Sequence, residues 1–351
     1  MSTRVDLQQR LETAGISYQT AEANGSWMIV APALGARILG AGTGEENAFW
    51  TAPVLAVRPW ADGGNAGGQR TWIAPEGGPL GFFFSNDLAL WKVPPALDPG
   101  NYFPQMGPPG SMAFRSSFVA EAADGRSYQI SITRAMSLQT AQIVGLEVAR
   151  IRFRHEISNT GTRTLDKCIG LWSIIQIPAE AGGTILLALR DTAPSDLDGV
   201  RACYTPIPPE MIRRYGQTVL LRTGCGRKYK VGVPASFSTG VVASIRPCAE
   251  PDRGNRRWIL TAKKFAVRPS ETYVDMMEAD NGHAAQAYND PGLGAMAFCE
   301  IESHAPAPAL TPGQSQAADI EILIAMAEER PLRRIIADEL RLDCPRDVFE
   351  G

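Results

Sequence analysis

The chain has 351 residues, 34 of them basic and 37 acidic, and a formal net charge of −3. A chain of this length can form one large β-fold or two ordinary domains. Because no long run of one charge sign occurs, we expect neither a nucleic acid nor a membrane as a partner. The start lacks the apolar core of a signal peptide, and no apolar run approaches the ~20 residues of a membrane span. We therefore predict a soluble, cytoplasmic protein, and the oligomeric state stays open.

The clearest helix signals lie near the two ends of the chain. Residues 6–15 (DLQQRLETAG) end at a glycine, and residues 331–340 (PLRRIIADEL) begin at a proline. Between them, short segments with two-residue alternation indicate antiparallel strands. We predict a mainly β fold, a single domain over residues 1–351 built as one large two-sheet sandwich. The predicted strands are residues 26–32, 35–41, 126–138, 144–158, 168–178, 218–224, 240–247, 256–267, 296–304 and 317–327.

The stretch GGQRTWIAPEGG, residues 67–78, predicts a further short strand that ends at the rim of a cleft. Arg70 and Trp72 share one face of it, and Glu76 joins them if the strand continues past Pro75. A guanidinium group binds hydroxyl pairs or a carboxylate and keeps its proton, which suits binding or charge stabilisation. A structural Arg70–Glu76 ion pair is the alternative.

Residues 75–113 interrupt the strand pattern with many prolines, glycines and aromatic residues. This stretch is too apolar for a disordered linker and too irregular for strands, and long ordered loops of this kind usually form a lid or a wall. We find no glycine-rich phosphate-binding motif and predict no cofactor. The six cysteines form no CxxC pair, which predicts reduced, mostly buried thiols at Cys168, Cys203, Cys225, Cys248, Cys299 and Cys344.

Two segments in the middle of the chain place polar groups beside apolar ones. His155 shares a face with Ile151 and Phe153, so it is either a hydrogen-bonded core histidine or a site residue. Trp172 and Gln176 share the face opposite the apolar side of their strand. An exposed tryptophan with a nearby amide can bind a sugar, because the ring covers C–H groups and the amide bonds hydroxyls. The alternative for Trp172 is the core.

The segment AFCEIESH carries the strongest chemical signal. Glu300, Glu302 and His304 alternate with small or apolar residues, so they share one face of a strand. Neighbouring carboxylates raise one another's pKa, which suits a general base, and the imidazole can move a proton. The alternative is a solvated outer face.

Lys264 and His283 are weaker candidates for contact with a ligand. Lys264 belongs to a lysine pair, which is ordinarily solvated, and His283 falls in an expected loop. Carboxylates and imidazoles on adjacent strands also suit a metal ion. No spacing in this chain is specific enough for one, and we predict no metal.

Four stretches together resemble the galactose mutarotase-like superfamily: residues 35–50 (GARILGAGTGEENAFW), 67–78, 152–178 and 297–315. The resemblance implies a β-supersandwich with a carbohydrate site on the concave face of one sheet. In aldose 1-epimerases of this fold a glutamate takes the proton of the anomeric hydroxyl, and this role falls to Glu300, with Glu302 as the competing register. The family's histidine acid would fall near Trp172 or Ser173, where this chain has none, which leaves His155, His283 or His304 to replace it.

We therefore expect a carbohydrate-active enzyme that acts at or near an anomeric centre and binds a small-molecule sugar. Glu300 or Glu302 is the expected base, His155 or His304 the acid, and the sugar is bound by Arg70, Trp72, Glu76, Trp172, Gln176, Lys264 and His283. The alternatives are a lyase or hydrolase that acts on a sugar acid held by Arg70, and a sugar-binding or sensing protein without catalysis.

Overall fold

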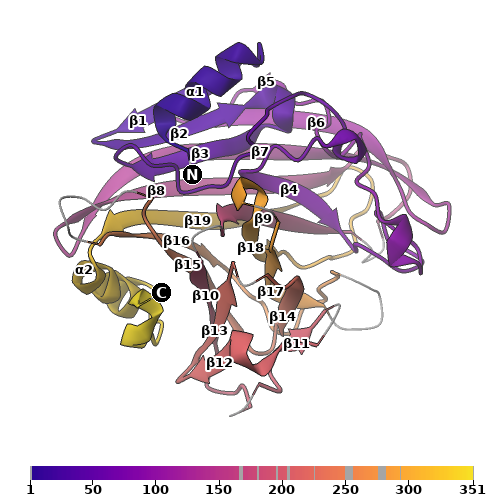
Figure 1. The fold of residues 1–351 in the computed structure, drawn as a ribbon. Coiled ribbons are helices and arrows are strands. Elements are labelled where there is room, and N and C mark those ends of the chain that lie inside the picture. Colours follow the sequence, from indigo (N-terminus) through magenta and orange to yellow (C-terminus); the bar gives the residue numbers. More distant parts are fainter. Residues whose placement is uncertain are drawn as a thin grey trace.

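The computed structural model describes residues 2–165, 169–179, 182–194, 197–203, 206–224, 226–249, 256–275, 282–292 and 294–350. Within these residues the chain forms two large antiparallel sheets that pack face to face (Figure 1). This confirms the predicted mainly β sandwich. Cys299 is a buried free thiol, three further free thiols at Cys203, Cys248 and Cys344 are half-buried, and Cys168 and Cys225 lie outside the described residues.

The first sheet has nine strands among the described residues, and it carries the candidate site. In spatial order they are β1 (Gln19–Ala23), β2 (Ser26–Ala31), β3 (Arg37–Thr43), β4 (Gln69–Ala74), β9 (Gly170–Pro178), β18 (Phe298–His304), β17 (His283–Asp290), β14 (Tyr229–Pro234) and β11 (Arg201–Ala202). Every neighbouring pair is antiparallel. The sheet therefore joins segments from all parts of the sequence, and its centre holds β4, β9, β18 and β17.

The second sheet has ten strands in the described part of the chain. Its spatial order is β12 (Ile212–Tyr215), β13 (Thr218–Thr223), β10 (Gly183–Leu189), β15 (Ser238–Pro247), β16 (Trp258–Phe265), β19 (Ser315–Ala327), β8 (Leu146–Asn159), β7 (Ser127–Ile143), β6 (Met112–Glu121) and β5 (Phe103–Gln105). The core lies between the two sheets, where Ile73, Leu171 and Ile301 of the first sheet meet Ile151 and Phe153 of the second.

All ten segments predicted as strands contain strands, and β4 is the short strand predicted from residues 67–78. The prediction missed β1, β5, β6, β10, β11, β12, β14 and β17. The strand β17 (HAAQAYND) is rich in alanine and amide side chains, which have little strand propensity, so its place inside the sheet comes from pairing with β14 and β18. Residues 75–113, expected to lack strands, contain β5 and the start of β6.

Both predicted helices are present with shifted ends. Thr3 caps α1 (Arg4–Thr13) through a capping box with Asp6, and Leu7 and Leu11 pack on the outer face of the first sheet. The segment predicted at 331–340 is α2 (Glu329–Arg334) followed by the π-helical turn η6 (Ile335–Glu339), both on the outer face of the second sheet. The one-turn helices are η1 (Pro32–Leu34), η2 (Trp60–Asp62), η3 (Leu88–Leu90), η4 (Pro209–Met211), η5 (Gly294–Met296) and η7 (Arg346–Phe349). None of the described helices combines the length and the apolar character needed to cross a membrane.

Candidate functional site

A cavity of about 490 Å³ opens on the outer face of the first sheet, the face turned away from the second sheet. A cavity of this size fits a small molecule. Its floor comes from β4, β9, β14, β17 and β18, and part of its wall comes from the aromatic loop that the sequence predicts as a lid or wall. The lining residues are Trp60, Arg70, Trp72, Glu76, Leu88, Trp91, Trp172, Lys228, Tyr229, Lys230, Tyr288, Asp290, Phe298 and Glu300.

The register of the strands aligns two rows of side chains across this face, all of them polar except Ile174. One row crosses β9, β18, β17 and β14 and consists of Gln176, Glu300, Tyr288 and Lys230. The next row crosses β4, β9, β18 and β17 and consists of Arg70, Ile174, Glu302 and Gln286. The two rows are neighbours, so Arg70 can reach Glu300 across β9. In the same way Lys230 can reach Glu302 across β17.

Arg70 and Glu300 form a buried ion pair in the cavity lining, with 2.9 Å between Nη2 and Oε1. The side-chain amide of Gln176 donates to the same Oε1 over 2.8 Å. Because both donors use Oε1, the second carboxylate oxygen of Glu300 is the one that can meet a ligand. The Arg70 guanidinium lies over the rings of Trp72 and Trp60, at 4.1 and 5.0 Å from their centroids. Arg70 and Glu300 therefore lie together at one cavity, as we expect from the sequence.

Lys230 is a central residue of the cavity that the sequence prediction missed. Its Nζ lies 3.3 Å from Oε2 of Glu302 and 3.6 Å from Oε2 of Glu76. The same ammonium group lies 4.4 Å from the ring centroid of Trp172. Glu76 reaches the cavity from the loop after β4, which ends at Ala74, so the strand does not continue past Pro75. Glu76 thus pairs with Lys230, while Arg70 pairs with Glu300.

Glu302 is fully buried, and burial raises its pKa to about 7. The positive charge of Lys230 opposes this rise, while the negative charges of Glu300 and Glu76 add to it. Trp172 donates its indole N–H to Oε2 of Glu302 over 2.7 Å. Glu302 can therefore hold or release a proton near neutral pH.

His304 faces the same side of the sheet but is tied into a hydrogen-bond chain. Gln286 donates its amide to Asp275 over 2.8 Å, so its oxygen faces His304 Nε2 at 2.9 Å, and that nitrogen carries the proton. Burial lowers the pKa of His304 to about 3, so the imidazole is neutral at physiological pH. Its ring stacks on Trp172.

His283 is the first residue of β17, whereas the sequence prediction places it in a loop. Its Nδ1 hydrogen-bonds with Asp275, and its ring packs against the backbone of Gly232. A Cβ at residue 232 would lie 2.3 Å from the ring, so only glycine fits there. His283 and His304 therefore belong to one buried network beside the cavity, and neither is among the residues that line it.

Two predicted site residues lie elsewhere. His155 is on β8 of the second sheet and points into the core between the sheets, where Nδ1 meets the Thr71 hydroxyl at 3.3 Å. Thr71 is on the opposite face of β4 from Arg70, so the first sheet separates His155 from the cavity. Lys264 is on β16, where its ammonium group pairs with Glu339 on the outer face of the second sheet. For His155 the structure shows the alternative of a hydrogen-bonded core histidine, and Lys264 lies outside the cavity. Alternation within a strand cannot tell which sheet the strand joins, so it could not decide between the alternatives.

Trp172 and Gln176 lie on the predicted face, but neither is exposed. Trp172 is 2% exposed because Lys230, Trp72 and His304 cover its ring, although one edge still borders the cavity. Gln176 is fully buried and acts through its bond to Glu300. Trp172 is therefore part of the wall and not the exposed platform that the sequence suggests.

Further lining residues were also missed by the sequence reasoning. Trp60 and Trp91 pack edge to face, and Trp91 donates its indole N–H to Glu76 over 2.7 Å. On β17, the Tyr288 hydroxyl donates to Asp290 over 2.8 Å. The aromatic content of the loop was a usable signal for Trp91. The sequence held no comparable signal for Lys230 and Tyr288, because the strands β14 and β17 that carry them were not predicted.

Lys263 lies under the site, in the core between the sheets. Its Nζ donates to the carbonyl and hydroxyl oxygens of Ser173 over 2.7 and 3.1 Å. Burial lowers the pKa of Lys263 to about 7, and the charge of Glu302 only partly opposes this. In the unfolded chain the pKa of Lys263 has its ordinary value near 10.5. The unfolded state therefore binds more protons than the folded state between these two values, which makes stability rise with pH across that window.

We expect the Lys263→Met variant to lack this pH dependence. In the parent protein the contribution of Lys263 to the free energy of unfolding rises by up to about 1.4 kcal/mol per pH unit above pH 7. Urea unfolding at pH 7, 8 and 9 measures the slope. Lys264→Met, on the opposite face of the same strand, is the matched control and keeps the parent slope. Equal slopes in the parent and Lys263→Met proteins would contradict the assignment.

Among the described residues, no group of three or more histidine, cysteine, aspartate and glutamate side chains is arranged to hold a metal ion. The carboxylates at the cavity pair with arginine and lysine side chains. The arrangement can therefore bind a polar molecule against aromatic walls and exchange protons with it.

Comparison with protein families places these residues in a known group. The model of a family of unknown function, DUF6786, matches residues 7–345. The chain belongs to this family. The match takes in all strands of both sheets and every lining residue of the cavity. No curated protein matches the sequence significantly.

Solved structures resemble the chain in fold at low sequence identity. A candidate aldose 1-epimerase from Escherichia coli K12 is 12% identical, with 90% of this chain and 100% of that chain covered and a TM-score of 0.53. A galactose mutarotase-like protein from Lactobacillus casei ATCC 334 is 10% identical, with 88% and 100% covered and a TM-score of 0.48. A candidate mutarotase from Salmonella typhimurium is 9% identical, with 92% and 100% covered and a TM-score of 0.48. The first likeness shows that the DUF6786 chain has the galactose mutarotase-like fold, which confirms the predicted fold.

Proposed function

We propose that the protein is a carbohydrate-active enzyme that acts at or near the anomeric centre of a neutral sugar. The observation that carries the proposal is Glu300, a carboxylate in an aromatic-walled cavity whose Oε1 is held by Arg70 and Gln176. This arrangement leaves Oε2 to meet a sugar hydroxyl. The galactose mutarotase-like fold also supports the proposal.

The lining suits the two-sided chemistry of a sugar. The rings of Trp60, Trp72 and Trp91 offer apolar surface to C–H groups, and the carboxylates and lysines offer hydrogen bonds to hydroxyls. The cations of the lining are already paired: Arg70 with Glu300, Lys230 with carboxylates, and Lys228 with Asp290 at 3.8 Å. A carboxylate on the ligand would compete with these partners and would meet the negative charges of Glu76, Asp290 and Glu300 in the lining. A neutral sugar is therefore favoured over the sugar acid of a lyase or hydrolase.

Glu300 is the proposed base and Lys230 the proposed acid. Oε2 of Glu300 takes the proton of the anomeric hydroxyl. The electron pair of that O–H bond forms the carbonyl at C1 while the bond from C1 to the ring oxygen breaks. The ring oxygen takes a proton from the Lys230 ammonium. After rotation about the C1–C2 bond, closure of the ring returns both protons. Lys230 takes the role of the expected imidazole, since His304 is neutral and engaged with Gln286.

Polarimetry on freshly dissolved α-anomers tests the proposal. With α-D-glucose, α-D-galactose and similar aldoses, we expect the relaxation of optical rotation to accelerate in proportion to protein concentration. Boiled protein is the control. If no aldose in the panel relaxes faster with the protein, the protein does not catalyse the interconversion of anomers.

The acid role predicts the behaviour of Lys230→Met. Loss of general acid catalysis lowers rates by about 10²–10⁴-fold, and we expect a decrease of that size in kcat. Lys264→Met, far from the cavity on the second sheet, is the control and keeps the parent rate. Circular dichroism of both variants establishes that they fold. A Lys230→Met rate within threefold of the parent would exclude Lys230 as the acid.

A sugar-binding protein without catalysis is the second candidate. It is favoured by one observation, that none of the described residues lining the cavity is a histidine. Calorimetry that detects a sugar, combined with polarimetry and product analysis that find it unchanged, would support this candidate. The Glu300→Ala variant would then bind the sugar normally.

A further inference from the structure

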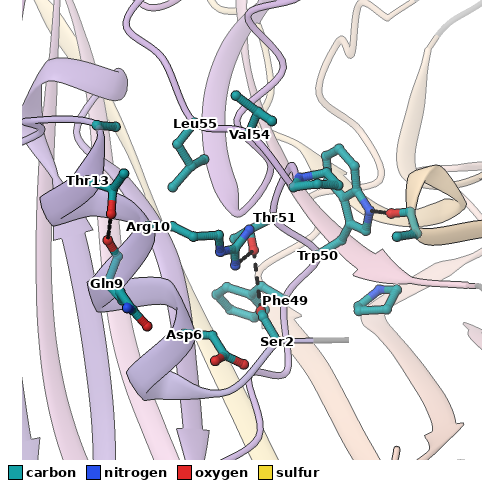
Figure 2. A pocket seen from close by; sticks show the side chains of 14 residues that line it. Ser2, Asp6, Gln9, Arg10, Thr13, Phe49, Trp50, Thr51, Val54 and Leu55 are labelled. Atoms are coloured by element: carbon teal, nitrogen blue, oxygen red, sulfur yellow. Dashed lines mark hydrogen bonds between the residues drawn. The ribbon is translucent and has the colours of Figure 1, made fainter.

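A second cavity, of about 750 Å³, lies between α1 and residues 49–55 (Figure 2). Phe49, Trp50 and Leu55 give it apolar surface, and Figure 2 shows Asp6, Gln9 and Thr13 of the helix along one side. Both cavities lie on the outer face of the first sheet, because α1 packs on that face as well. Neither the proposed enzyme nor the sugar-binding alternative needs this cavity.

The two cavities share a wall. Trp50 lines the second cavity and Phe298 lines the first. The centroids of their rings are 4.9 Å apart. Phe298 is opposite Pro178 in the sheet, and Pro178 also lines the second cavity. Phe298 and Glu300 are two residues apart on one face of β18, or about 7 Å along the strand. The wall that separates the two cavities therefore lies about 7 Å along β18 from the proposed catalytic carboxylate.

Hydrogen bonds hold the walls of the second cavity in place. Arg10 donates to the carbonyl oxygen of Ala52 over 2.6 Å and to the hydroxyl of Thr51 over 2.8 Å, which fastens the segment to the helix. Trp50 donates its indole N–H to the carbonyl oxygen of Ala295 over 2.8 Å. The cavity is thus shaped by specific contacts between three separate parts of the sequence.

We propose that the second cavity holds a further unit of a neutral carbohydrate chain whose end unit occupies the first cavity. This inference rests on the proposed function and names its substrate class, a reducing oligosaccharide. The apolar floor suits C–H groups, and the exposed polar side chains of α1 suit hydroxyls. The charges of Asp6 and Arg10 balance, which fits an uncharged ligand. The shared wall of Trp50 and Phe298 places the two cavities side by side, which favours one chain that passes over these rings and reaches both.

Calorimetry with a matched sugar series measures the effect. The probes are D-glucose, maltose and maltotriose, together with D-galactose and lactose. We expect at least one of the longer sugars to bind about tenfold or more tightly than its monosaccharide, a difference of about 1.4 kcal/mol. If a monosaccharide binds and no longer sugar of the series binds more tightly, the inference is wrong while the proposed function stands. If no sugar binds, both are wrong.

A variant then locates the extra affinity. Gln9→Trp fills the second cavity from an exposed helix position, so it leaves the fold unchanged. We expect it to reduce the affinity of the longer sugar to that of the monosaccharide and to leave monosaccharide binding unchanged. Val5→Trp, on the same helix at a residue that is 60% exposed and outside the cavity, is the control and keeps the full gain.

Two outcomes would overturn this location. A gain in affinity that Gln9→Trp leaves intact would place the further unit elsewhere. A dimer in sedimentation velocity that Gln9→Trp alone dissolves would assign the cavity to a second copy of the chain.

Discussion

The Glu300→Gln variant is expected to lose anomeric interconversion by about 10²–10⁴-fold in kcat, the usual size of a general base effect. An amide oxygen still accepts hydrogen bonds from Arg70 and Gln176, so the cavity keeps its shape and KM changes little. The amide cannot take a proton from the sugar. A large decrease in kcat with a nearly constant KM separates loss of the base from loss of binding.

Polarimetry gives both parameters, and calorimetry with the same sugar gives the affinity. Glu121→Gln, an exposed carboxylate on β6 of the second sheet, is the matched control and keeps the parent kcat. If Glu300→Gln retains the parent kcat while Glu302→Gln loses it, the base is Glu302.

The Arg70→Met variant is expected to lose about 3–5 kcal/mol of unfolding free energy, because it leaves the buried Glu300 carboxylate without its ion-pair partner. The loss includes the contacts of the guanidinium with Trp72 and Trp60. Methionine keeps much of the volume of the side chain, so the change tests the charge more than the packing. Urea unfolding at pH 7 measures the difference.

The double variant Arg70→Met/Glu300→Met tests whether the charge is the cause. Removing both charges leaves no unpaired buried ion, and we expect the double variant to be more stable than Arg70→Met alone. Arg154→Met, which removes an exposed ion pair with Asp319, is the control and changes stability by less than about 1 kcal/mol. A double variant as unstable as the sum of the two single ones would show that the pair is not coupled.

Two-residue alternation was enough to predict the faces of the central strands. In β18 it separated Glu300, Glu302 and His304 from the apolar residues that face the core. In β4 it placed Arg70 and Trp72 together, and both line the cavity. In β8 it identified the apolar face that carries His155. The chemistry of a strand face is readable because successive side chains point to opposite sides.

Alternation could not predict how much water reaches each face. Glu302 and His304 were expected either in a wet site or on a solvated surface, and both are buried. The loop after β4 and the Lys230 side chain of β14 cover this face, and neither could be predicted from the sequence of β18. Burial is what moves the pKa of Glu302 up to about 7 and that of His304 down to about 3. The protonation chemistry of the site is therefore a property of the tertiary structure.

The sequence alone determined the mainly β architecture, most of the strands, and which side chains within each strand point together, because these follow from local periodicity. The tertiary structure decided which strands became neighbours, and so paired Arg70 with Glu300, brought in Lys230 from an unpredicted strand and left His155 in the core. The physical reason is that strand pairing joins residues that are far apart in the sequence, and no local pattern records the partner.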